Sequence, residues 1–144
     1  MSYTVIAPAY FMENLWNPWN VASLARGRFP SSIPPAREIQ QVSIGDVIQL
    51  ATHVIVRREE FAGERITVAA DSISAFDAVE IITRQTGRHL DIDTHPSGGP
   101  LPLFAWLNRV GYAIDVDALR RRFPTIRWHR FEEWVPTQDW SVIA

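Results

Sequence analysis

The spacing of apolar residues alternates between two periods along the chain, which predicts strands interleaved with helices. Short β-branched or alternating runs are typical of strands, which we expect at residues 3–7, 65–69 and 90–94. Apolar residues three and four positions apart, with start and stop signals, predict helices at residues 20–25, 44–55, 74–86, 101–110 and 115–123. Because parallel strands need crossover connections, this order predicts an α/β protein with a small, partly parallel sheet and a C-terminal helical segment.

Several helix ends carry recognisable sequence signals. Ser43 followed by Asp46 fits a capping box, so we interpret Asp46 as a helix-capping residue rather than a catalyst. Gly87 can end the helix over 74–86 in a left-handed conformation, and Asp115 can cap the last helix. The residues expected to face the core are Ile44, Val47, Ile48, Ala51, Val54 and Ile55 in one helix and Phe76, Val79 and Ile82 in the next.

Two proline-rich stretches interrupt the regular pattern. Residues 11–35 combine prolines with aromatic side chains, which predicts an ordered excursion that lines a pocket. Residues 96–102 are rich in Pro and Gly and predict a loop. We expect one domain over residues 1–144, with an α/β body at 1–95 and a helical segment at 96–144.

Composition excludes several function classes. With 47% hydrophobic and 21% charged residues, the chain can bury one sizeable core. A net charge of -2 argues against a nucleic-acid partner, and the lack of cysteine excludes disulfides and thiolate chemistry. Without a secretory signal or a long apolar run, we expect a cytoplasmic protein that does not insert in membranes.

The run from Thr4 to Asn14, TVIAPAYFMEN, resembles the sixth strand and following loop of NmrA-like atypical short-chain dehydrogenases. Ala7 stands where that family has Arg. Further segments match the family in the same order, at residues 41–47, 61–71, 86–88 and 111–124. The resemblance covers essentially the whole chain and implies a truncated, Rossmann-like fold equivalent to the C-terminal half of the family.

The nucleotide-binding signals of that family are missing from this sequence. No glycine-rich turn follows the first strand, and no Tyr-x-x-x-Lys pair is present, since the chain contains no Lys. We therefore expect no cofactor to be bound by this chain alone. Loss of a neighbouring half would expose apolar surface, which predicts a homodimer or a complementary partner chain, unless the chain is a fragment.

The resemblance places the first excursion on the substrate side of a cleft. Six tryptophans also indicate a pocket for a flat or hydrophobic ligand, although these rings can instead fill the core or a dimer seam. We expect the substrate to contact Pro8, Phe11, Asn14, Trp16 and Trp19.

The candidate catalytic residues are Glu13, Tyr10 and His95. Glu13 beside an apolar pocket can act as general acid or base, with Tyr10 and Asn14 orienting a carbonyl group. The alternative for Glu13 is a solvated or helix-capping residue.

The remaining histidines give weaker signals. His89, Asp91, Asp93 and His95 share one face of a predicted strand, a possible metal pattern that we interpret as a solvated polar face, so we expect no metal. His53 is expected on the helix side away from the apolar stripe. Neither His53 nor His129 has a partner identifiable in the sequence.

Three functions remain open. The first is a cofactor-independent cyclase or isomerase that acts on a hydrophobic or polyketide-like molecule. The second is a non-catalytic binding or regulatory protein. The third is a half-reductase that needs a partner chain for NAD(P)H binding.

Overall fold

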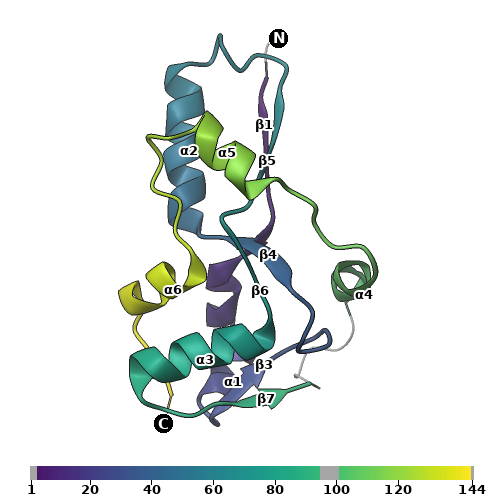
Figure 1. The fold of residues 1–144 in the computed structure, drawn as a ribbon, viewed down its shortest axis with the longest axis vertical. Helices are drawn as coiled ribbons and strands as arrows, with labels where there is room; N and C mark the ends of the chain where they lie inside the picture. Colours follow the sequence, from purple (N-terminus) through teal and green to yellow (C-terminus); the bar gives the residue numbers. More distant parts are fainter. Residues whose placement is uncertain (1–2, 95–100, 144) are drawn as a thin grey trace.

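The computed structural model describes residues 3–94 and 101–143 and shows an α/β protein with three small sheets (Figure 1). The parallel pairs are β1 (Val5–Pro8) with β5 (Arg65–Val68), β2 (Tyr10–Phe11) with β4 (Ile39–Val42), and β3 (Arg28–Pro30) with β7 (Asp91–Asp93). The other edge of β4 pairs antiparallel with β6 (Asp71–Ile73). The partly parallel sheet predicted from the sequence is therefore divided into three.

In the part of the chain that the structure describes, six α-helices connect and cover these strands. They are α1 (Pro18–Leu24), α2 (Ile44–Val56), α3 (Ala75–Thr86), α4 (Pro102–Arg109), α5 (Val116–Arg122) and α6 (Phe131–Trp134). Short 3-10 helices span Met12–Trp16 and Val135–Thr137. In Figure 1, α2 and α5 flank β1 and β5 at one end of the molecule, while α1, α3, β3 and β7 gather at the other. Among the described residues, no helix is both long and apolar enough to cross a membrane.

The sequence signals at helix ends are largely confirmed. Gly87 ends α3 with φ of 70°, and the Asp115 carboxylate accepts a hydrogen bond from the Ala118 amide at 2.8 Å. At α2 only half of the predicted capping box forms. The Ser43 hydroxyl accepts from the Asp46 amide at 3.1 Å, but the Asp46 carboxylate turns to a different partner, described below.

The predicted inward faces of two helices are partly wrong. Phe76 on α3 is 58% exposed, whereas Ile82 is fully buried. On α2 the buried residues are Leu50 and Val54, with Val47 packed against them. The three isoleucines of α2, Ile44, Ile48 and Ile55, are exposed. The helix has two apolar stripes, one buried and one exposed, so apolar spacing alone does not reveal which stripe meets the core.

Two apolar clusters hold the fold together, and each joins distant parts of the chain. One packs α3 against the first 3-10 helix and the C-terminal residues from Phe131 to Ile143. The other packs α2 and β5 against Leu119, Phe123 and Trp128. The open cavity that we consider as a site lies next to the first cluster, because Leu15, Phe29, Ile73, Ala78 and Phe131 belong to both.

Candidate functional site

A cavity of about 360 Å³ opens between β2, β4 and β6, the start of α3 and the excursion predicted to line a pocket. Its wall is mostly apolar. The apolar and aromatic lining residues include Leu15, Trp19, Phe29, Ile33, Ile39, Ile73, Phe104 and Phe131. A volume of this size suits a small organic molecule, and such pockets usually pair an apolar wall with a few polar groups.

Most of the polar lining residues already hydrogen-bond to nearby chain. The side-chain oxygen of Asn17 accepts from the backbone amide of Asn20 at 2.9 Å. The side-chain amide of Asn20 donates to the backbone carbonyl of Asn14 at 2.8 Å. The Ser31 hydroxyl donates to the Ile33 carbonyl, and the Ser74 hydroxyl caps α3. These bonds shape the wall. The groups left to meet a ligand are the side chains of Tyr10, Ser32, Arg37 and Gln41.

Tyr10 is a hydrogen-bond donor facing the cavity. Burial raises the pKa of its phenol above the ordinary value of 10.0, a hydrogen bond from Asn14 opposes that rise, and nearby Tyr112 adds to it. The phenol is therefore protonated at neutral pH, and its O–H can donate a hydrogen bond to an oxygen of a ligand in the cavity.

Arg37 lies where the main cavity meets a smaller polar cavity of about 230 Å³. One guanidinium nitrogen, Nη2, donates to the carbonyls of Leu107 at 3.4 Å and Val110 at 3.2 Å, at the C-terminal end of α4. Its Nε atom is buried and has no hydrogen-bond partner in the described chain. No sequence motif marked this residue. A lone arginine before a four-residue strand looks like an ordinary surface charge until the fold places it.

The residues predicted to bind substrate divide into two groups. Trp19 lines the cavity, and Asn14 acts on it through Tyr10. Pro8, Phe11 and Trp16 are outside the described lining, so their expected place in the pocket is corrected. Trp16 stacks against Trp140 with ring centres 4.9 Å apart, and Phe11 packs against the α2 cluster. Both rings therefore fill the core, the alternative left open for the aromatic residues.

Glu13 does not face the cavity either, which corrects its expected position beside the pocket. Both of its carboxylate oxygens accept from the Ile44 amide at 3.0 Å, and one accepts from the Trp134 indole at 3.1 Å. Glu13 thus caps α2 from a remote segment, where a carboxylate complements the positive end of the helix dipole. The structure supports the helix-capping alternative for this residue.

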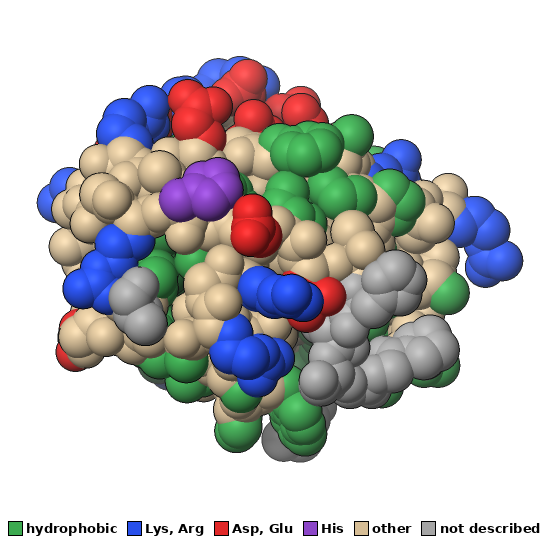
Figure 2. Space-filling model, turned by 90° about the horizontal axis from the view of Figure 1, so that it is seen from below, with side chains coloured by type: hydrophobic (Ala, Val, Ile, Leu, Met, Phe, Trp, Pro, Cys, Tyr) green, Lys and Arg blue, Asp and Glu red, His purple; other side chains and the backbone are tan. Residues whose placement is uncertain are grey.

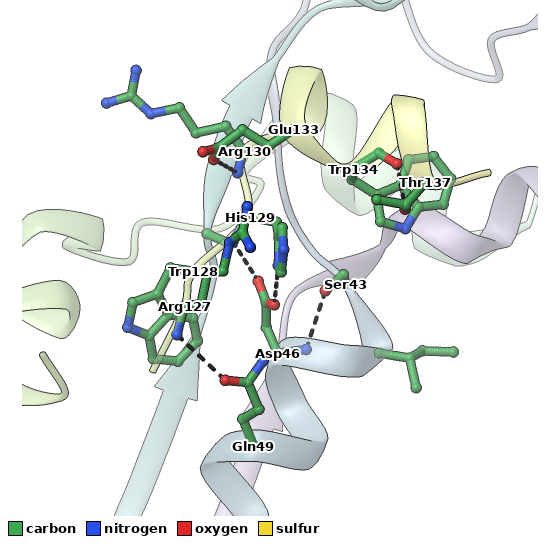
Figure 3. Close-up of polar contacts among 12 residues, drawn as sticks. Ser43, Asp46, Gln49, Arg127, Trp128, His129, Arg130, Glu133, Trp134 and Thr137 are labelled. Carbon is green, nitrogen blue, oxygen red and sulfur yellow. Dashed lines mark hydrogen bonds and ion pairs between the residues drawn. The ribbon is translucent and has the colours of Figure 1, made fainter. Parts of the chain in front are cut away.

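Asp46 and His129 form a buried contact that the sequence did not reveal (Figure 3). Asp46 is fully buried, and its carboxylate accepts from the His129 backbone amide at 2.8 Å and from its Nδ1 at 2.6 Å. In Figure 3 the carboxylate points from the first turn of α2 to the segment before α6. No local pattern could reveal this contact, because 83 positions separate the two residues. His129, for which no partner was identifiable in the sequence, is paired with Asp46.

The remaining histidines give no metal site in the described chain. His89 contacts Asp91 at 3.3 Å on an exposed edge, and no group of three metal-ligating side chains comes together among residues 3–94 and 101–143. His53 contacts the rings of Phe61 and Phe123 rather than pointing away from the packed side, a further correction. His95, a candidate catalytic residue, lies outside the described residues.

The surface near the α1 and α3 end has no continuous basic patch on the face that Figure 2 shows. Basic, acidic and apolar side chains are interspersed there. Nucleic-acid binding needs clustered positive charge, so this face offers no such footprint.

Comparison with known proteins identifies the fold. No protein-family model and no curated protein matches the chain. A nucleoside-diphosphate-sugar epimerase from Staphylococcus aureus is similar with a TM-score of 0.65 at 13% identity, covering 94% of this chain and 52% of its own. A putative epimerase from Burkholderia cenocepacia J2315 gives a TM-score of 0.65 at 18% identity, covering 96% and 45%.

The negative transcriptional regulator NmrA, solved in complex with NADP, gives a TM-score of 0.61 at 13% identity and covers 94% of this chain and 52% of its own. The chain thus spans about half the length of these solved structures. At such identities the likeness shows the fold alone. It confirms the α/β, Rossmann-like architecture that the resemblance to NmrA-like proteins implied.

Proposed function

We propose that this chain binds a small, largely apolar molecule in the cavity between β2, β4 and the start of α3. The observation that carries the proposal is the cavity itself, about 360 Å³ with an apolar wall. Apolar walls supply affinity by burying ligand surface, and a few placed donors fix orientation. Here the donors are Tyr10, Arg37 and Gln41, grouped on neighbouring strands and the segment before β4.

Filling the cavity tests this proposal. Ala75 lines the cavity at the first position of α3, at the edge of the first apolar cluster, and is only partly buried, so the ring of Ala75→Phe can extend into the cavity. We expect Ala75→Phe to weaken binding of naphthalene-1-carboxamide at least about tenfold by isothermal titration calorimetry, because the ring occupies ligand space. Ala62→Phe, in the exposed turn after α2 and outside the described lining, is the control and should bind like the parent. Equal affinity in all three proteins would contradict a cavity site.

A second candidate is an enzyme of the cyclase or isomerase type that needs no cofactor. One observation favours it. The Tyr10 phenol is protonated at neutral pH, held by Asn14 and open to the cavity, so it can donate a hydrogen bond to a reacting carbonyl oxygen. If the Tyr10→Phe protein turns over a substrate at the same rate as the parent protein, this candidate function is wrong.

We also propose that the outer face of α2 packs against a second copy of the chain. Ile48 and Ile55 are 59% and 69% exposed and lie on one stripe with Ile44, to one side of the buried face. An exposed apolar stripe of this kind is typical of a surface that another chain covers. The helix carries no charged side chain on this outer face, so a two-fold axis would bring no like charges together. A complementary chain that binds NAD(P)H is the alternative occupant.

Light scattering distinguishes these arrangements. We expect the parent protein to have twice the mass of one chain and Ile48→Glu to have the mass of one, because a buried unpaired carboxylate is costly. Phe76→Glu, which changes an exposed apolar residue on α3, is the matched control and should remain a dimer. A parent protein that is monomeric at every concentration, or an Ile48→Glu dimer, would refute self-association through this face.

A further inference from the structure

We infer that the ligand of the cavity carries a carboxylate and that Arg37 binds it. This inference rests on the proposed binding function and specifies the chemical class of the ligand. Arg37 is the one charged residue in the described lining, so the wall carries a net positive charge. A ligand that enters such a site is favoured if it brings one negative charge.

The charge of Arg37 is not neutralised within the described chain. No carboxylate forms an ion pair with it among residues 3–94 and 101–143. Its neighbour in sequence, Glu38, accepts a hydrogen bond from Ser72 instead. The two carbonyls at the end of α4 contribute only partial negative charge, which orients the guanidinium without cancelling its full charge. A partly buried cation without a counter-ion favours an anion from outside.

The position of the guanidinium is fixed on one side. At Gly111, which follows α4 with φ of 73°, an added Cβ would lie 3.4 Å from Arg37 Nη2 and 3.3 Å from the Leu107 carbonyl oxygen. The missing Cβ of Gly111 therefore leaves room for Nη2, and the two carbonyl contacts hold it at the end of α4. The Nε atom has no hydrogen-bond partner in the described chain, so the protein does not satisfy every donor of Arg37.

A carboxylate fits this site better than a phosphate. One guanidinium supplies one positive charge, which matches a group with a single negative charge, and because Nη2 already donates to two carbonyls, Nη1 is the nitrogen that would donate to the ligand. The additional donors are neutral. Tyr10 offers its phenol O–H. Gln41 offers its side-chain amide, which makes no hydrogen bond to the described residues. The apolar wall then encloses the body of an aromatic or alicyclic acid.

Two isosteric probes test the inference. Naphthalene-1-carboxylate and naphthalene-1-carboxamide have nearly the same shape and differ in charge. By titration calorimetry on the full chain we expect the carboxylate to bind at least about tenfold more tightly, the range for a hydrogen bond to a charged group. Raising the salt concentration should reduce this preference.

Variants of Arg37 identify the source of the preference. Arg37→Met keeps the length of the side chain and should abolish the preference while the carboxamide still binds, which shows that the cavity is intact. Arg37→Lys should restore part of it. Arg109→Met, an exposed change at the same end of α4, should leave it unchanged.

The outcomes separate the two proposals. Binding of neither probe to the parent protein overturns the binding function and this inference with it. Equal binding of both probes supports the function and overturns the inference, as does an Arg37→Met protein that still prefers the carboxylate.

Discussion

Asp46→Ala is expected to lower the free energy of unfolding by about 3 kcal/mol, the largest effect of any single polar change in this protein. The Asp46 side chain is fully buried and holds both the backbone amide and the Nδ1 atom of His129. Its removal leaves two donors of His129 without their acceptor and opens a small void beside α2. Urea denaturation followed by tryptophan fluorescence measures the loss.

The control for this prediction is Asp117→Ala, an exposed acidic residue in the first turn of α5, which should change stability only slightly. A double-mutant cycle with His129→Ala isolates the contact, because the two losses should be far from additive. Additive losses, or a loss from Asp46→Ala as small as the control's, would show that the pair contributes little.

Glu13→Ala is the second large change, with an expected loss of about 2 kcal/mol. It removes the acceptor for the Ile44 amide at the start of α2 and for the indole of Trp134, which is 3% exposed. Because Glu13 is outside the described cavity lining, the affinity for naphthalene-1-carboxamide should stay the same. The free energy of unfolding and the affinity are measured on the same samples.

Glu59→Ala is the matched control for this second change, because Glu59 is exposed in the turn after α2. A Glu13→Gln protein should lose less stability than Glu13→Ala, since the amide oxygen still accepts one bond. If Glu13→Gln instead keeps full stability and loses probe binding, Glu13 belongs to the binding site and the helix-capping interpretation fails.

The sequence predicted the helices well because their signals are local. Ser43, Gly87 and Asp115 mark helix ends through bonds that span at most four residues. Strands β2, β3, β4 and β6 were not predicted, since two to four residues are too few to show alternation. The division of the chain into residues 1–95 and 96–144 stays a prediction.

The candidate site was harder to predict than the fold. Tyr10 and Trp19 line the cavity, while their predicted roles in catalysis and substrate binding stay predictions. Arg37 was missed, because the carbonyls that hold its guanidinium lie at the end of α4, about 70 positions further along the chain. Glu13 was expected in the pocket because sequence order cannot show which way a side chain turns after a strand of two residues.

The two carboxylates at the start of α2 also constrain when this protein can acquire its structure during synthesis. Glu13 accepts from the amide of Ile44, 31 positions away in the sequence. Its second partner, Trp134, lies 121 positions from Glu13, and the partner of Asp46, His129, lies 83 positions from Asp46. Until residues 129–134 leave the ribosome, the buried Asp46 carboxylate has no His129 to bind. The nascent chain must therefore hold α2 with its outer face exposed and its buried face covered only by residues from β1 to β5.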